Sequence, residues 1–294
     1  MPEFPDVEIY VERLTGLIIG QQLKTIRFNS PFVLRSVVPP IGDAHNRTVR
    51  GITRLGKQIV LSLEGDLHLV FHLMISGRLR WRKPGSALPK GIGLAAFDFE
   101  PGVLLFTEAS KKKRASLRLV SGRAALQTLD RGGLEILESD LDTFAKALTR
   151  ENHTLKRALT DQSILSGVGN AYSDEILHRA RLSPVKLTQR LHDDEMTRLY
   201  HATREVLIEW VARLREKSSG QFPEKVSAFH DEMSVHGRYG KPCPICLAPV
   251  QRIVFADSEA NYCARCQTGG KLLADRALSR LLKKNWPKTL MELD

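Results

Sequence analysis

The sequence has no long hydrophobic stretch. Its 294 residues contain no uninterrupted apolar run of about 18 residues, the length that a membrane-spanning helix requires. The N-terminus also lacks the basic and then apolar order of a signal peptide. We therefore expect a soluble cytoplasmic protein without membrane association.

Acidic residues are the minority among the charged ones. The chain has 33 Asp and Glu against 44 Lys and Arg, which gives a formal net charge of +11. This balance favours a polyanionic partner such as DNA or RNA. Charge alone does not separate nucleic-acid enzymes from other basic proteins.

Cysteine is scarce and confined to one region. The four cysteines form two pairs, Cys243-x2-Cys246 and Cys263-x2-Cys266, with sixteen residues between the pairs. Paired turns of this kind converge four thiolates on one tetrahedral zinc ion, and the spacer suits a β-hairpin. We expect one structural Zn²⁺, because four protein ligands leave no open position for catalysis and disulfides are rare in a reducing compartment.

The N-terminal octapeptide Met-Pro-Glu-Phe-Pro-Asp-Val-Glu is unusual in carrying two prolines and three carboxylates. It predicts a short stiff arm in front of a helix over 7–18. Removal of Met1 leaves Pro2 as a secondary amine beside Glu3. An α-amino group titrates near ~8, so part of it is neutral and nucleophilic, and a carboxyl can transfer a proton. The alternative is an ordinary solvated terminus.

Periodicity predicts an α+β protein with two domains. Short β-rich runs from Gln22 to Leu119 predict a β-sandwich. Its expected strands are 23–28, 48–55, 58–63, 68–73, 94–99 and 103–106. Helical spacing returns over 154–162, 171–181 and 193–216. The expected divisions are a sandwich domain 1–130, a linker 131–150, a helical DNA-binding domain 151–234, a zinc finger 235–268 and a basic tail 269–294 with an amphipathic helix over 271–286.

Two glycine turns have the composition of phosphate-binding sites. Gly56-Lys57 lies between two expected strands, and Gly167-Val168-Gly169-Asn170 precedes an expected helix. Glycines leave backbone N–H groups accessible, and the N-terminus of a helix favours anions. Each motif alone is more often a simple turn or a packing feature.

Taken together, three stretches resemble the formamidopyrimidine-DNA glycosylase and endonuclease VIII family. They are the octapeptide, the run from Leu155 to Pro184 around Gly-Val-Gly-Asn, and the four-cysteine finger. The resemblance implies a β-sandwich, a helix–two-turn–helix domain and a zinc finger. It also implies a nucleoid-associated monomer that acts on damaged double-stranded DNA.

The resemblance further implies a bifunctional DNA glycosylase and AP lyase of base excision repair. Pro2 would attack the sugar C1′ and form a Schiff base, Glu3 would protonate the sugar ring oxygen, and β,δ-elimination would nick the strand. Asp6 would support the arm where relatives have glutamate. Lys57 would belong to the catalytic residues with Pro2 and Glu3 and would also contact DNA. The other residues implied to contact DNA are Met74, Ile75, Lys112, Lys113, Arg114, Lys156 and Asn170.

Three departures from the family pattern bear on specificity. In His72-Leu73-Met74-Ile75-Ser76-Gly77 the methionine is shifted by one position, so either Met74 or Ile75 could fill the vacated base stack. The basic run 111–114 replaces a loop that carries a phenylalanine wedge in relatives. Ser258 stands where relatives have the arginine at the tip of the finger, so either Arg252 or Arg265 substitutes for it or the finger docks differently.

These departures keep two alternatives open. One is a non-catalytic protein that binds damaged DNA on the same scaffold. The other is an enzyme that prefers oxidised pyrimidines or abasic sites over oxidised purines.

Overall fold

The structure is a computed structural model that describes residues 1–29, 31–224, 226, 230–255, 258–274, 281–282 and 287–292. The chain divides into two compact units. Unit 1 comprises Met1–Arg131 and Trp210–Ala228, and unit 2 comprises Gly132–Glu209 and Phe229–Asp294. The predicted α+β class with two domains is confirmed. Among the described residues, no helix has both the length and the apolar character needed to cross a bilayer.

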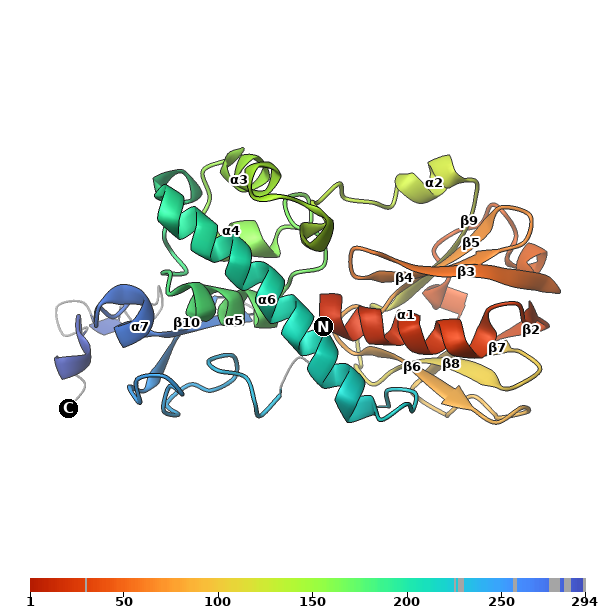
Figure 1. The fold of residues 1–294 in the computed structure, drawn as a ribbon. Coiled ribbons are helices and arrows are strands. Elements are labelled where there is room, and N and C mark those ends of the chain that lie inside the picture. The colour runs from red at the N-terminus through yellow and green to blue at the C-terminus, as the bar shows by residue number, and fades with distance from the viewer. Residues whose placement is uncertain are drawn as a thin grey trace. The chain divides into compact units, whose positions relative to one another are not determined.

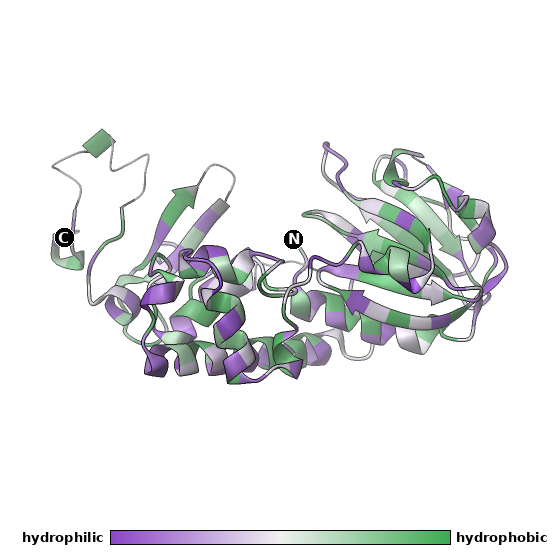
Figure 2. Ribbon diagram, turned by 90° about the horizontal axis from the view of Figure 1, so that it is seen from above, coloured by the Kyte–Doolittle hydropathy of each residue, from purple (hydrophilic) through white to green (hydrophobic). Residues whose placement is uncertain are grey.

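Unit 1 is a β-sandwich of antiparallel strands (Figure 1). Its strands are β1 Gln22–Leu23, β2 Thr25–Phe28, β3 Arg47–Leu55, β4 Gln58–Leu63, β5 Leu67–His72, β6 Gly77–Arg82, β7 Gly93–Asp98, β8 Val103–Glu108 and β9 Ser116–Ser121. One sheet has the order β1-β3-β4-β5-β9 and the other β2-β7-β8-β6. Most hydrophobic colour in this unit lies on the strands (Figure 2).

Aromatic rings join the two sheets of the sandwich. The ring of Phe71 in β5 lies 4.9 Å from that of Phe97 in β7 and 5.6 Å from that of Phe106 in β8, both with edge-on geometry. All three side chains are buried. Offset and edge-on pairs of this kind add to the stabilisation from apolar burial.

Helix α1 (Phe4–Ile18) packs one face against the sandwich core. Val7, Tyr10, Leu14 and Ile18 recur at helical spacing and are fully buried. The helix begins three residues earlier than predicted, because Phe4 and Pro5 occupy its first two positions, where proline's missing N–H removes no helical bond. The arm in front of the helix is correspondingly short.

Two strands were missed by the sequence prediction. In β6, Gly77, Leu79 and Trp81 alternate with arginines, and in β9, Leu117 and Leu119 alternate with the polar Ser116 and Arg118. Period-two alternation is the signature of a strand with one buried face, so the signal was present in both segments.

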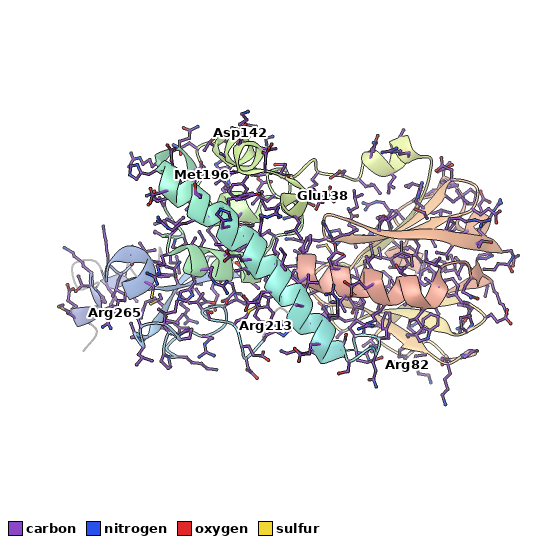
Figure 3. The ribbon with its side chains drawn as sticks, in the orientation of Figure 1. Arg82, Glu138, Asp142, Met196, Arg213 and Arg265 are labelled. Atoms are coloured by element: carbon purple, nitrogen blue, oxygen red, sulfur yellow. The ribbon has the colours of Figure 1, made fainter. Side chains whose placement is uncertain are left out.

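Unit 2 and the connecting segments are mainly helical. The helices are α2 Arg123–Gln127, α3 Leu141–Thr149, α4 Leu155–Thr160, α5 Asn170–Ala180, α6 Asp193–Ser218 and α7 Ala264–Thr268. Short 3-10 turns are η1 Pro31–Val33, η2 Ile41–Ala44, η3 Ile136–Glu138, η4 Thr188–Arg190 and η6 Leu290–Glu292. The apolar stripe predicted for α6 is largely buried, and Met196 lies in the first turns of this helix (Figure 3).

The segment 131–150 differs from the expected linker. It contains α3, whose Asp140 side chain accepts a hydrogen bond from Thr143 N at 2.8 Å and caps the helix. Phe144 and Leu148 on α3 are fully buried, so this segment belongs to the packed part of unit 2. The glycines that suggested a linker mark only its first residues.

The expected helical domain 151–234 is also divided differently. Residues from Trp210 to Ala228 group with unit 1, where Arg215 Nε donates to Glu12 Oε2 at 3.0 Å. In the same unit Arg82, which Figure 3 labels, donates through Nη2 to Glu224 Oε2 at 2.8 Å. A continuous helical pattern therefore did not indicate where one compact unit ends.

The finger hairpin consists of β10 (Val250–Phe255) and β11 (Ser258–Cys263), paired antiparallel. The amphipathic helix expected over 271–286 is wrong at its start, because Lys271 forms an isolated bridge with Thr289 and residues 272–274 are not helical. Leu281 and Leu282 are helical, and residues 275–280 and 283–286 lie outside the described part of the chain.

Candidate functional site

Two buried carboxylates, Glu3 and Asp6, lie at the start of α1. Glu3 is the residue that precedes the helix, and its backbone N–H donates to Asp6 Oδ2 at 2.8 Å. The side chains belong to residues that are each only 2% exposed. Burial raises the pKa of Asp6 to about 7, and the charge of Glu3 acts in the same direction. The Asp6 side chain, one methylene shorter than the glutamate that relatives have, thus accepts a hydrogen bond directly from the backbone of the arm.

The N-terminal amine lies in the same desolvated region. Burial lowers the pKa of the Met1 amino group, while the charge of Glu3 opposes this shift. The positive charges of Arg78 and Lys57 lower the pKa further. Pro2 is itself buried. A lowered pKa increases the neutral, nucleophilic fraction of an amine at neutral pH.

Lys57 occupies the turn between β3 and β4 and is only 7% exposed. Gly56 before it has a φ of 60°, which suits glycine. Arg54 holds this turn: it donates to Gly56 O and to Glu8 Oε1, both at 2.9 Å, and its guanidinium lies 4.4 Å from the centre of the Phe4 ring. The Lys57 turn and the start of α1 thus share one anchoring residue.

The structure brings together Glu3, Asp6 and Lys57 as predicted site residues, and it adds Arg78 and Arg54. Neither arginine was assigned a role from sequence. Arg78 follows Ser-Gly in the His72–Arg78 run, and the alternation of β6 could have placed its side chain opposite the buried Leu79. Arg54 gave no signal of its own, because the side chains that it contacts, Glu8 and Phe4, come from α1.

Met74 and Ile75 lie on a tight turn between β5 and β6. Met74 is half-buried with a φ of 52°, whereas the Ile75 side chain is 60% exposed. Burial lowers the pKa of His72 to about 4, and its Nδ1 accepts a hydrogen bond from Met74 N at 3.1 Å. Of the two apolar residues, Ile75 is therefore the one presented to solvent.

The basic run 111–114 is exposed along its whole length. Lys113 Nζ donates to Glu108 O and to Gly91 O, the second at 3.1 Å. This ammonium therefore holds the loop against the end of β8 and against the segment before β7. The Glu108 carboxylate accepts from Arg114 N at 2.9 Å. Lys112 and Arg114 are predicted contact residues with exposed, positively charged side chains, which suit phosphate contact.

In unit 2 the turn at Gly167–Gly169 leads into α5. Asn170 is the first residue of this helix, and its Nδ2 donates to Glu259 O at 3.0 Å. Lys156 Nζ donates to Asn170 O at 2.7 Å and to Asp174 Oδ1 at 2.6 Å. Lys156 is therefore occupied by an internal ion pair, and its geometry positions Asn170.

Lys156 and Asn170 also line a pocket of ≈ 600 Å³ in unit 2. Arg157 from α4 and Ile253 and Ala260 from the finger hairpin contribute to the same pocket. The N-terminus of α5 and the two basic side chains of Lys156 and Arg157 at this pocket suit an anionic group.

The four cysteines converge as predicted. Their sulfur atoms all lie within 4.8 Å of one another, with 3.3 Å between Cys246 Sγ and Cys263 Sγ and 3.9 Å between Cys243 Sγ and Cys266 Sγ. Four thiolates around one zinc ion lie about 3.8 Å apart, as follows from a Zn–S distance of about 2.3 Å in a tetrahedron. All four are free cysteines, so the donor set fits a metal ion.

Residues outside the cysteine pairs support this cluster. His178 Nε2 lies 3.3 Å from Cys243 Sγ, and burial lowers the pKa of His178 to about 4. Glu175 accepts hydrogen bonds from Ser234 N and Val235 N at 2.7 and 2.9 Å, which ties α5 to the segment before the first cysteine. Neighbouring groups that orient metal ligands are a regular part of metal sites.

The two arginines considered as substitutes for the finger-tip arginine both have internal partners. Arg252 Nη1 lies 3.4 Å from Glu259 Oε2 and its guanidinium stacks 4.3 Å from the Tyr239 ring centre. Arg265, which extends from α7 (Figure 3), donates to Cys246 O at 3.2 Å. The hairpin tip at 256–257 lies outside the described residues, as does the side chain of Ser258.

Three family models match consecutive parts of the chain. They are the formamidopyrimidine-DNA glycosylase N-terminal domain at residues 1–121, the formamidopyrimidine-DNA glycosylase H2TH domain at 133–221, and the zinc finger found in FPG and IleRS at 240–269.

Relatives match over nearly the whole chain. The formamidopyrimidine-DNA glycosylase of Thermus thermophilus is 34% identical over 276 residues, which cover 92% of this chain and all of the relative. A formamidopyrimidine-DNA glycosylase-like protein of Mycobacterium tuberculosis, described as uncharacterized, is 41% identical over 152 residues, or 51% of this chain and 94% of the relative.

Solved structures agree with these matches. The crystal structure of MutM (Fpg) from Thermus thermophilus has a TM-score of 0.75 and 33% identity, covering 90% of this chain and 98% of that one. Lactococcus lactis Fpg in complex with DNA containing Fapy-dG has a TM-score of 0.80 and 25% identity, covering 90% and 100%. From its family matches and its full-length relatives, this chain belongs to the formamidopyrimidine-DNA glycosylase and endonuclease VIII family of DNA repair glycosylases.

Proposed function

We propose that this protein is a bifunctional DNA glycosylase and AP lyase that removes oxidised bases from duplex DNA. The observation that carries the proposal is the desolvated start of the chain, where Pro2, Glu3 and Lys57 are all buried. Burial lowers the pKa of the terminal amine there, and the positive charges of Arg78 and Lys57 act in the same direction, whereas the charge of Glu3 opposes the shift. Relatives crystallised with Fapy-dG DNA and with abasic-site DNA support damaged duplex DNA as the substrate.

In the proposed reaction Met1 is removed and the Pro2 nitrogen becomes the terminal amine. The neutral amine attacks C1′ of the damaged nucleotide, and the C1′–base bond breaks as the base leaves with its electron pair and a proton. Glu3 protonates the sugar ring oxygen, the ring opens, and an iminium ion joins Pro2 to C1′. Loss of the 3′ phosphate and then of the 5′ phosphate completes β,δ-elimination.

The other residues act by position and charge in this proposal. Asp6 fixes the backbone of Glu3 through the 2.8 Å hydrogen bond. Lys57 binds a phosphate beside the lesion and favours the neutral amine through its positive charge. Asn170 with the helix N-terminus of α5 holds phosphates in unit 2. We also propose that the four-cysteine cluster binds one Zn²⁺, which would hold the finger hairpin closed when bound.

Borohydride trapping tests the proposed chemistry. Reduction of the Schiff base joins the protein covalently to DNA that contains an abasic site. We expect a trapped adduct with the wild type and its loss in Pro2→Gly and in a form that retains Met1. Correctly processed wild-type protein that gives no adduct would show that the protein is a non-catalytic DNA-binding protein.

Glu3→Gln separates the two halves of the reaction. We expect this variant to lose excision of a damaged base more severely than trapping on a preformed abasic site, because the abasic sugar already opens to an aldehyde. Equal losses on both substrates would contradict the assigned role of Glu3. Cutting rates on duplexes with 8-oxoguanine, formamidopyrimidine, oxidised pyrimidine and abasic lesions then identify the preferred substrate.

A further inference from the structure

Glu108, the last residue of β8, is a buried carboxylate that no step of the proposed reaction uses. It is 1% exposed. Its Oε2 accepts hydrogen bonds from Arg114 N at 2.9 Å and from Ala115 N at 3.1 Å, and its Oε1 accepts one from Ser76 Oγ at 3.3 Å. One side chain therefore contacts two separate connections of the sandwich.

The first connection is the apolar turn, residues 73–77, which carries the exposed Ile75. Gly77 closes it by donating to Leu73 O at 2.8 Å, and Gly77 also pairs with Glu108 across β6 and β8. A Cβ atom on Gly77 would lie 2.2 Å from Leu73 O and 3.0 Å from Ala115 Cβ. Gly77 is thus packed without space for a side chain.

The second connection is the basic loop, residues 109–115. Its four consecutive basic side chains are exposed, whereas Ala115 at its end is buried beside Gly77. Lys113 Nζ donates to the Glu108 carbonyl oxygen, so the backbone and the carboxylate of one residue both hold the loop. Without this anchor a loop of mutually repelling cations would open.

We propose that Glu108 is a positioning residue that fixes the apolar turn and the basic loop relative to each other. Phosphate contact by the loop and insertion of Ile75 into the base stack then occur as one event. This inference rests on the proposed function for the presence of DNA, but the joint between the two connections is a property of the free protein.

The physical basis is the cost of removing a buried acceptor. Glu108→Ala leaves the N–H groups of Arg114 and Ala115 without their partner, and hydrogen bonds to a charged group are among the stronger ones. Glu108→Gln keeps one oxygen for these N–H groups and turns an amide toward the Ser76 hydroxyl, so it should fold. Ser76→Ala removes only the contact with the apolar turn.

Trypsin cleavage of the free protein tests the joint. We expect the rate of cleavage after residues 111–114, followed by mass spectrometry, to rise about tenfold in Glu108→Ala and only a few-fold in Glu108→Gln, since the loop opens more often. Ser76→Ala and Ile75→Ala should cleave at the wild-type rate. Wild-type cleavage in both Glu108 variants would overturn the proposal.

Insertion into DNA is measured with 2-aminopurine placed next to a tetrahydrofuran abasic analogue in a duplex. We expect its fluorescence to rise when wild-type protein saturates the duplex and to stay low for Glu108→Ala and Ile75→Ala. An unchanged rise in Glu108→Ala alongside faster cleavage would reduce Glu108 to a loop anchor and refute the coupling.

A variant that does not fold and a wild-type protein that does not bind the duplex lead to different conclusions. If Glu108→Ala does not fold, Glu108→Gln carries the test, and wild-type values for both its cleavage and its fluorescence overturn the proposal. If wild-type protein does not bind the duplex, the proposed function fails, while the cleavage rates still decide whether Glu108 holds the loop.

Discussion

At the scale of single residues, burial decides the chemistry of the candidate active site. Glu3, Asp6 and Lys57 are nearly inaccessible to water, and the same charges act on one another and on the terminal amine. Desolvation penalises the charged form of a group, and it is the largest cause of the raised pKa of Asp6 and of the lowered pKa of the terminal amine. Composition and spacing carry no information on this effect.

The pKa of Asp6 gives a prediction about pH and stability. A folded pKa of about 7 exceeds the unfolded value of 3.8, so the contribution of Asp6 to stability is complete below pH 3.8 and is lost as the pH rises through 7. Asp6→Asn keeps an oxygen for Glu3 N and cannot ionise. The free energy of unfolding of Asp6→Asn minus that of wild type should therefore increase as the pH rises from 4 to 8, by on the order of 2–4 kcal/mol.

Urea unfolding across this pH range measures the difference. Asp140→Asn is a matched control, because the hydrogen bond from Thr143 lowers the pKa of Asp140 below its ordinary value of 3.8, so that its contribution changes only below this range and the difference from wild type should stay constant across it. An Asp6→Asn curve parallel to wild type would show that Asp6 titrates normally.

At the scale of elements, short connections position the functional groups. The β3–β4 turn presents Lys57, the β5–β6 turn presents Ile75, and the turn before α5 presents Asn170. Rigid strands and helices hold these turns, which is the usual arrangement for sites built on loops. Sequence located the turns at Lys57 and Asn170 from their glycines, while the exposure of Ile75 over Met74 depended on the local backbone.

The four cysteines at the finger hairpin allow a test of zinc binding. We expect one bound zinc per wild-type chain by elemental analysis and none in Cys266→Ser, because removal of one thiolate breaks a four-ligand site. Arg265→Gln, one residue away on α7, should keep its zinc, because Arg265 is not one of the four ligands and donates to the backbone oxygen of Cys246. Zinc retained in Cys266→Ser would contradict the assignment of the ligands.

At the scale of the whole molecule, the net charge of +11 should set the affinity for DNA. Each phosphate neutralised by the protein contributes about −0.9 to the slope of log K against log salt concentration. We expect a steep slope for wild type. In Lys112→Gln the magnitude of the slope should fall by about 0.9, the contribution of one phosphate contact.

Lys146→Gln is the control for this measurement. On the surface of α3, Lys146 Nζ lies 2.6 Å from Asp142 Oδ2. We therefore expect removal of the Lys146 charge to leave the slope unchanged. Equal slopes for Lys112→Gln and wild type in fluorescence anisotropy titrations would remove Lys112 from the DNA contact.

The sequence by itself determined the features that depend on local order. Cysteine spacing predicted the metal cluster, short β-rich runs at regular spacing predicted the sandwich, and proline and glycine marked the arm and the turns. Only the tertiary structure decided which side chains meet: Arg54 and Arg78 beside the arm, Glu108 between two connections, and Lys156 in an ion pair with Asp174. These pairings join residues that are distant in the chain, and burial and partner atoms there follow from packing, which local patterns do not encode.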